Sequence, residues 1–203
     1  MSIAAFDAVR PPVAAAGDAG SGTFAYCSQQ YRVLFGAGTS ARLGEEAERL
    51  GIKRALVLTT PEQQDLGHRL GAGLGDRLAG LFAGARMHTP VEVTNEALRI
   101  VESRDIDGLV AIGGGSTVGL GKALSLRTGL PHLAVPTTYA GSEMTPILGE
   151  TANGIKTTQH SQDLVPDAVI YDVDLTVIAA DAVSDAEARG DGERRFALHG
   201  LGG

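Results

Sequence analysis

The stretch GLVAIGGGSTVGLGKALSLRT, residues 108–128 of the 203-residue chain, decides the fold. Residues 108–112 are apolar or small and predict a buried strand, and residues 116–128 predict a helix. Three consecutive glycines join them. Without a Cβ atom the backbone can approach a ligand closely, and free N–H groups at the helix N-terminus point to the same place. The segment predicts a strand–turn–helix unit that binds an anion such as a pyrophosphate, with a merely glycine-rich turn as the alternative.

The rest of the chain alternates between strand and helix patterns. Short apolar runs predict further strands at 31–35, 55–58, 85–88, 133–135 and 168–171. Amphipathic spacing predicts helices at 41–50 with an N-cap at Ser40, at 61–78 with leucine every fourth residue, and at 94–104 with an N-cap at Thr94. This order of elements predicts an α/β fold with a Rossmann-like parallel sheet.

Composition divides the chain into three parts. Residues 1–22 are rich in Ala, Gly, Pro and Asp and predict a flexible leader. Residues 23–176 carry the alternating pattern and predict a dinucleotide-binding α/β domain. Residues 177–203 carry charge and glycine with little apolar periodicity, which predicts a divergent tail that is disordered or forms a short helix.

Charge and cysteine content exclude several classes of protein. The net charge of −7 argues against a nucleic-acid partner, and the sequence holds no apolar run long enough to cross a membrane. A single cysteine excludes an internal disulfide framework and a cysteine-based zinc site, and favours a reducing, cytoplasmic location.

A second polar segment follows the strand predicted at 133–135. Its sequence, PTTYAGSEMT at 136–145, supplies many hydroxyl groups. In a parallel sheet it would lie at the carboxyl edge beside the glycines, where doubly wound folds bind ligands. Alternatively, the hydroxyls satisfy the backbone of their own loop. The candidate cofactor contacts from the two segments are Gly114, Gly115, Ser116, Thr117, Thr137, Thr138, Ser142 and Thr145.

Two further residues bear on the cofactor. Thr59 ends the strand at 55–58, where an acidic residue would bind a ribose 2′-hydroxyl and repel a 2′-phosphate. Threonine does neither strongly, so use of both NADH and NADPH is expected if this is the ribose position. Lys122 lies one and a half turns into the helix, and the pattern leaves open whether it reaches the phosphates or lies on the surface.

The chain offers no signature of nucleophilic or metal chemistry. The five histidines lack the spacing of a helical metal site, and there is no G-x-S-x-G segment. No metal is therefore expected, and no catalytic residue is assigned.

Several long segments together resemble one enzyme family. GGGSTVGLGKA (113–123), PTTYAGSEMTPILGE (136–150), KTTQ (156–159) and VIYDVDLT (169–176) are similar to segments of the maleylacetate reductases. These belong to the iron-containing alcohol dehydrogenase superfamily, which shares its fold with dehydroquinate synthase. RVLFGAG (32–38), LVLTTPEQ (56–63) and MHTPVEVT (87–94) match as well. Many members of the superfamily carry Asp where this chain has Gly119.

The resemblance implies a function. Family members use NADH or NADPH to reduce the carbon–carbon double bond of 2-maleylacetate, giving 3-oxoadipate in the breakdown of aromatic and chloroaromatic compounds. It also implies that Lys156, with the glycine and threonine positions above, contacts the dinucleotide, and that Thr59 lies near the adenosine ribose. A homodimer is a weaker implication.

The resemblance ends at Thr176. The family fold continues there into an all-helical domain, which carries the metal ligands of the iron enzymes and the substrate-pocket residues of the reductases. Its absence predicts a truncated or frameshifted product with weak nucleotide binding and little or no catalysis. The alternatives are a stand-alone NAD(P)-binding module without catalysis, or a fragment of another iron-type alcohol dehydrogenase.

Overall fold

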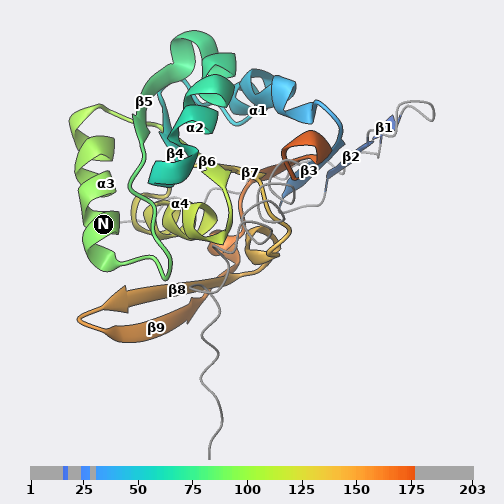
Figure 1. Cartoon of the computed structure of the whole chain (residues 1–203). Coiled ribbons are helices and arrows are strands. Elements are labelled where there is room, and N and C mark those ends of the chain that lie inside the picture. The colour runs from blue at the N-terminus through green and yellow to red at the C-terminus, as the bar shows by residue number, and fades with distance from the viewer. Residues whose placement is uncertain (1–15, 18–23, 28–30, 177–203) are drawn as a thin grey trace, which may run out of the picture.

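The computed structural model describes residues 16–17, 24–27 and 31–176, so most of the predicted leader and all of the predicted tail lie outside it. An eight-stranded sheet in the order β1-β2-β3-β10-β7-β6-β4-β5 forms the centre of the fold (Figure 1). The six strands from β3 to β5 in that order run parallel, while β1 and β2 pair antiparallel at one edge. The strands are β1 (Ala16–Gly17), β2 (Phe24–Cys27), β3 (Arg32–Gly36), β4 (Ala55–Leu58), β5 (Leu78–Phe82), β6 (Gly108–Gly113), β7 (His132–Pro136) and β10 (Ala168–Asp172).

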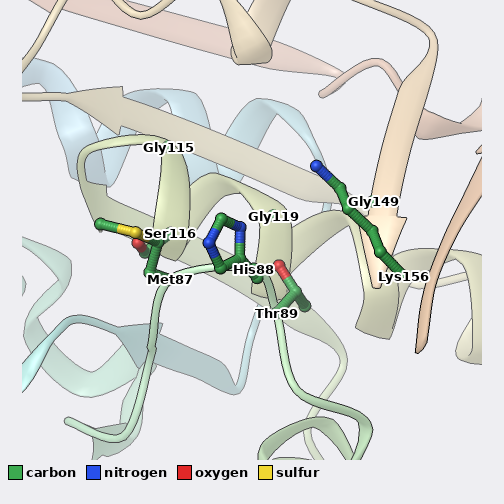
Figure 2. A pocket seen from close by; sticks show the side chains of 8 residues that line it. All are labelled: Met87, His88, Thr89, Gly115, Ser116, Gly119, Gly149 and Lys156. Carbon is green, nitrogen blue, oxygen red and sulfur yellow. The ribbon is translucent and has the colours of Figure 1, made fainter. Parts of the chain in front are cut away.

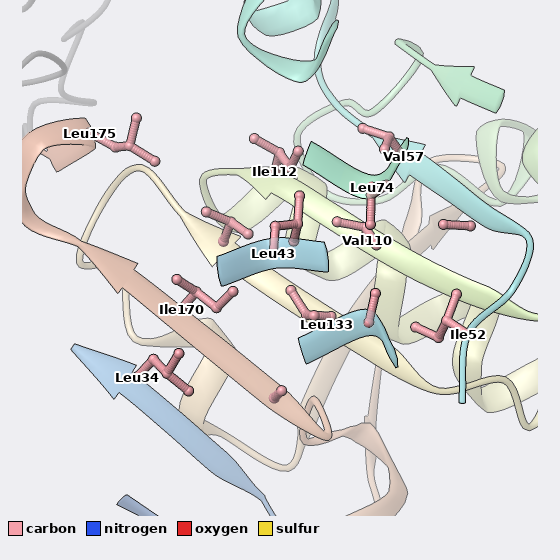
Figure 3. Close-up of a cluster of buried hydrophobic side chains, with 14 residues drawn as sticks. Leu34, Leu43, Ile52, Val57, Leu74, Val110, Ile112, Leu133, Ile170 and Leu175 are labelled. Atoms are coloured by element: carbon pink, nitrogen blue, oxygen red, sulfur yellow. The ribbon is translucent and has the colours of Figure 1, made fainter. Parts of the chain in front are cut away.

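Helices cover both faces of the sheet. On one face α1 (Leu43–Arg49) and α2 (Gln64–Gly71) pack on the strands, and on the other lie α3 (Val91–Ser103) and α4 (Gly115–Thr128) (Figure 1). Strands buried on both faces have continuous apolar sequences, as β4 and β6 do here. Figure 3 shows the first of these layers, in which Leu43 lies over Val110 and Leu133. The prediction of an α/β, Rossmann-like fold is confirmed.

The order of the strands locates the place where a ligand is expected. The chain passes from β4 outward to β5 and then returns to add β6 on the other side of β4. Strand order therefore reverses between β4 and β6. In open parallel sheets, ligands bind at the carboxyl ends of the strands that flank such a reversal. The glycines at 113–115 follow β6 and lie at this point.

A separate hairpin lies beside α4. Strands β8 (Ile147–Ala152) and β9 (Ile155–His160) pair antiparallel, and Leu148 of β8 packs against Ala123 of α4. All six residues of β9 are exposed. The hairpin therefore extends the α4 side of the domain below the sheet (Figure 1).

Three sequence predictions of local structure are wrong. The strand expected at 85–88 is instead β5 at Leu78–Phe82, because the leucine-rich helix ends early. That helix gives way to the 3-10 segment η3 (Ala72–Arg77), where Gly75 has non-helical dihedral angles. Helix α3 begins at Val91, after Pro90 in the N-cap position, so Thr94 lies inside it and its hydroxyl contacts the Pro90 carbonyl.

The N-cap expected at Ser40 is also wrong. The helical region after β3 begins with η1 (Thr39–Arg42), and its first residues are held by the Asp172 carboxylate, which accepts hydrogen bonds from the N–H groups of Gly38 and Ser40. Helix α4 has Gly114 as its N-cap and no side-chain cap, so the Ser116 hydroxyl is available for another partner.

Candidate dinucleotide-binding site

The glycine turn, residues 113–115, leads from β6 directly into α4. Gly113 has φ 149°, a conformation that side chains disfavour, and a Cβ atom there would lie 2.5 Å from the Thr117 hydroxyl oxygen. The first helical hydrogen bonds run from the N–H groups of Thr117 and Val118 to the Gly114 carbonyl. The N–H groups of Gly115 and Ser116 precede them at the positive end of the helix dipole, an arrangement suited to an anion.

Residues 137–145, the hydroxyl loop, lie against this turn. A Cβ atom on Gly114 would be 3.0 Å from the Thr138 hydroxyl oxygen, and one on Gly115 would be 3.6 Å from that of Ser142. Within the loop, the Thr145 hydroxyl donates to the Ser142 carbonyl over 3.1 Å. The structure therefore brings together the two segments that the sequence predicted to be neighbours.

Three buried hydroxyl groups near the sheet edge have no hydrogen-bond partner within the described part of the chain. They belong to Thr59, Thr117 and Ser142, all of them predicted cofactor contacts. A buried polar atom without a partner is costly, so such groups commonly mark the place of a water or a ligand. The Ser142 hydroxyl, which faces Gly115, fits a site for a polar cofactor. The Thr59 methyl group packs against Gly67 of α2.

A pocket of about 330 Å³ opens at the first turn of α4 (Figure 2). Gly115 and Ser116 form one wall, and the segment 87–89 passes in front of them. Lys156 reaches in from β9 on the opposite side, passing over Gly149. The lining residues are Met87, His88, Thr89, Gly115, Ser116, Gly119, Gly149 and Lys156.

Glycine at two of these positions lets other side chains enter the pocket wall. A Cβ atom on Gly149 would lie 3.2 Å from Cε of Lys156, and one on Gly119 would lie 2.5 Å from the Thr89 hydroxyl oxygen. A larger residue at 149 would push the lysine aside. Gly119, where many superfamily members have Asp, leaves room for Thr89.

The segment 87–89 is the part of the pocket that sequence reasoning missed. His88 has φ 65° and Thr89 has φ 43°, an uncommon conformation for non-glycine residues and especially for a β-branched one. The Thr89 carbonyl is anchored by the N–H of Thr151 on the hairpin. The similarity of MHTPVEVT to the family is the only sequence signal there, and it assigned no role to these residues.

Gln63, from the 3-10 segment η2 (Pro61–Gln63) after β4, was also missed. Its side-chain amide donates to the Thr137 hydroxyl over 3.0 Å and lies over Gly113. This contact ties the loop after β4 to the loop after β7, across the end of β6. The ends of three strands thereby form one polar surface.

Lys122 is neither at the phosphate position nor on the surface, the two possibilities that the sequence left open. Its side chain is buried and donates to the main-chain carbonyls of Thr145 and Ile147. Burial lowers the pKa of Lys122 to about 8, although the nearby Glu143 carboxylate opposes that shift.

Three of the four histidines in the described residues fit structural or surface roles, and His199 lies outside the described part of the chain. His132 is buried beside Gly121 of α4, and burial lowers its pKa to about 3, with a smaller contribution from the Lys122 charge. It therefore stays neutral at physiological pH. His68, His88 and His160 are exposed, and of these three only His88 lines the pocket.

Comparison with known proteins identifies the family to which the chain belongs. Residues 30–173 match the iron-containing alcohol dehydrogenase family. The chain belongs to this family of oxidoreductases.

Within this family, the chain is similar to maleylacetate reductases. The chain is 51% identical over 154 residues to the maleylacetate reductase of Rhizobium sp. (strain MTP-10005), covering 76% of this chain and 44% of the relative. The crystal structure of maleylacetate reductase from Agrobacterium tumefaciens superposes with a TM-score of 0.71 at 52% identity, over 72% of this chain and 42% of that one. The chain thus spans less than half the length of the maleylacetate reductases it resembles.

A more distant relative was solved with a cofactor. Sulfoacetaldehyde reductase from Bifidobacterium kashiwanohense, in complex with NAD⁺, is 26% identical, with a TM-score of 0.67 over 72% of this chain and 46% of that one. In this chain the N–H groups of the glycine turn, the Ser142 hydroxyl and Lys156 are the donors near the first turn of α4.

The family name also implies a metal, and the described residues do not fit one. Across residues 31–176, no group of three or more His, Cys, Asp or Glu side chains is placed to hold an ion. We therefore derive no step through iron. Separately, none of the described helices is long and apolar enough to cross a membrane.

Proposed function

We propose that this chain is the dinucleotide-binding part of a maleylacetate reductase, and that it binds NADH or NADPH at the carboxyl edge of its sheet. The observation that carries the proposal is 51% identity to a maleylacetate reductase over 154 residues. Two observations support the proposal: helix α4 has no side-chain cap at its N-terminus, and the buried Ser142 hydroxyl opposite Gly115 has no partner among the described residues.

Each part of the site has a separate task in this proposal. The N–H groups of Gly115 and Ser116 bind the pyrophosphate, and the Lys156 ammonium neutralises part of its charge. Thr138 and Ser142 orient the rest of the dinucleotide by hydrogen bonds. Thr59 remains a predicted neighbour of the adenosine ribose. When bound, the dinucleotide supplies the hydride.

The proposed reaction is reduction of the double bond of 2-maleylacetate to give 3-oxoadipate. Hydride transfer requires the cofactor and substrate to be held together with water excluded. The described domain supplies one wall of such a site. The resemblance assigns the second wall to the family's helical domain, so we propose that the described domain by itself binds the cofactor and turns over little maleylacetate. The homodimer, the cytoplasmic location and the preference between NADH and NADPH remain predictions.

Two measurements on the purified chain test this function. NADH fluorescence is titrated with the protein, and NADH oxidation is followed with and without maleylacetate. Saturable NADH binding with slow, maleylacetate-dependent oxidation is expected. Binding with no dependence on maleylacetate would favour a stand-alone nucleotide-binding module. Oxidation that requires an added divalent metal and an aldehyde would indicate another iron-type alcohol dehydrogenase. Absence of NADH and NADPH binding would contradict the proposal.

A further inference from the structure

Lys122 is a buried cation in the middle of α4. Only 1% of the residue is exposed, and its Nζ atom donates to the carbonyls of Thr145 over 2.6 Å and Ile147 over 2.9 Å. The Thr145 hydroxyl oxygen lies 3.4 Å from the same nitrogen. Burying an ammonium group is costly, and an apolar side chain could fill this space. Packing alone therefore does not explain why a charged side chain occupies this position.

The two carbonyls lie at the junction between the hydroxyl loop and the hairpin, since Ile147 is the first residue of β8 and Thr145 precedes that strand. Thr145 lies between the 3-10 segment η4 (Ser142–Met144) and the first residue of β8, with extended dihedral angles. Main-chain carbonyls that no helix or sheet pairs need other donors where water is kept away. Lys122 provides a donor to both, on either side of Pro146.

These contacts connect three parts of the candidate site. Ser116 lies on the same helix as Lys122, Thr145 ends the hydroxyl loop, and Ile147 begins the hairpin that carries Lys156. A displacement of the Lys122 amine would therefore release the hydroxyl loop and the start of the hairpin together. Ser116 would keep its place, because the glycine turn is fixed by its own backbone.

A second buried group holds the same loop from the sheet. The Glu143 carboxylate, 2% exposed, accepts a hydrogen bond of 2.6 Å from the Tyr171 hydroxyl at the end of β10. Burial, together with this hydrogen bond, raises the pKa of Tyr171, so the hydroxyl remains a donor. The loop is thus attached at Glu143 to the sheet and at Thr145 to α4.

We propose that Lys122 is a positioning residue that fixes the hydroxyl loop and the β8–β9 hairpin against α4, so that Thr145 and Lys156 meet the cofactor whose phosphates bind at Ser116. The effect on cofactor affinity rests on the proposed function. The effect on the loop itself does not depend on it.

The test compares Lys122→Met with Leu124→Ala in the full 203-residue chain. Methionine has similar length and no donor. Leu124 is buried on the same helix within the cluster that includes Leu109 and Ala97, so its truncation lowers stability without touching the loop. Amide hydrogen exchange is measured in peptides covering residues 137–150, and NADH affinity by fluorescence titration.

In Lys122→Met we expect exchange to rise selectively across residues 137–150 and NADH affinity to fall about tenfold, the equivalent of losing one strong charged hydrogen bond. In Leu124→Ala we expect a lower melting temperature with the NADH dissociation constant unchanged. Tyr171→Phe removes another contact that holds the same loop, so amide hydrogen exchange in this variant should rise around residue 143.

Equal exchange of this segment in Lys122→Met and the wild type would overturn the proposal. So would a loss of affinity in Leu124→Ala as large as that in Lys122→Met, since the effect would then be general destabilisation. If the wild-type chain binds neither NADH nor NADPH, the proposed function fails, and exchange alone decides the role of Lys122.

Discussion

The glycine turn and the hydroxyl loop border the same candidate site, but they are held in place differently. The turn takes its shape from its own residues, since Gly113 has a positive φ and Gly114 caps α4 directly. The loop has little regular structure and is held by side chains from elsewhere, namely Gln63, Lys122 and Tyr171.

This difference predicts how each region responds to substitution. A change in the turn acts on the anion site itself, because backbone and binding groups are the same atoms. A change at an anchor of the loop acts at a distance and in part, because other anchors remain. Substitutions in the turn should therefore lower cofactor affinity more than substitutions at the anchors of the loop.

The largest effect is expected from Gly113→Ala. The new Cβ atom would meet the Thr117 hydroxyl at 2.5 Å and the Gln63 amide oxygen at 2.6 Å, at a φ of 149°. Strain of this kind costs about 1–3 kcal/mol, and NADH affinity should fall about 100-fold as the turn rearranges. Isothermal titration measures the affinity.

The control for this variant is Gly73→Ala, where a Cβ atom would have no neighbour within 4 Å. It should leave affinity unchanged and stability the same or slightly higher. Equal affinity for NADH in Gly113→Ala and Gly73→Ala would show that the turn is not part of the binding site.

A smaller effect is expected from Lys156→Met. The ammonium group lies across the pocket from the α4 N-terminus, but the residue is exposed, so water and salt weaken its attraction for phosphate. Affinity should fall about three- to tenfold at low ionic strength and less at high salt. Lys53→Met removes an exposed lysine away from the pocket and should not change affinity at any salt concentration.

Tyr171→Phe should weaken binding about two- to fivefold, because it releases only one anchor of the loop. The buried Glu143 carboxylate loses its donor, which should also lower the free energy of unfolding by about 1–3 kcal/mol. Chemical denaturation measures the latter. Tyr139→Phe is the matched control, since Tyr139 is 60% exposed. A loss of stability in the control equal to that in Tyr171→Phe would contradict the role given to the Glu143 contact.

The least direct effect concerns stability, because the buried Lys122 amine should make the free energy of unfolding depend on pH. Its pKa is lowered from 10.5 to about 8 in the folded chain, mainly by burial. Above pH 8 the unfolded chain keeps this proton more readily than the folded chain, so the free energy of unfolding should rise with pH. Below pH 8 the full cost of the buried charge is present.

Urea denaturation between pH 8 and 9.5 checks this expectation, below the range in which tyrosines titrate. The slope should be lower in Lys122→Met than in the wild type. If the free energy of unfolding changes equally with pH in the two proteins, the buried Lys122 amine does not cause the pH dependence.

The two regions also differ in how far the sequence predicted them. The strand–glycine–helix unit at 108–128 was found at the right residues because its signal is local: an apolar run, three glycines and a helical pattern. The hydroxyl loop was correctly placed beside it, because parallel strands end at a common edge. What anchors the loop was not predicted.

The unpredicted features depend on contacts between distant residues. Lys122 bonds to carbonyls 23 and 25 residues away, and Gln63 to a hydroxyl 74 residues away. The unusual backbone at His88 and Thr89 follows no residue preference, and it occurs where Thr151, far along the chain, bonds to the Thr89 carbonyl. Sequence patterns reveal periodicity and local conformational preference. Contacts between distant residues change neither of these, so they cannot be predicted from such patterns.

In the proposed function, the glycine turn and the hydroxyl loop together form one cofactor site. Hydrogen exchange of the wild-type chain, measured with and without saturating NADH, tests whether both segments contact the cofactor. We predict slower exchange in peptides covering residues 113–118 and 137–147, with little change in α1 and β3. Unchanged exchange in both segments, or protection elsewhere alone, would contradict the claim.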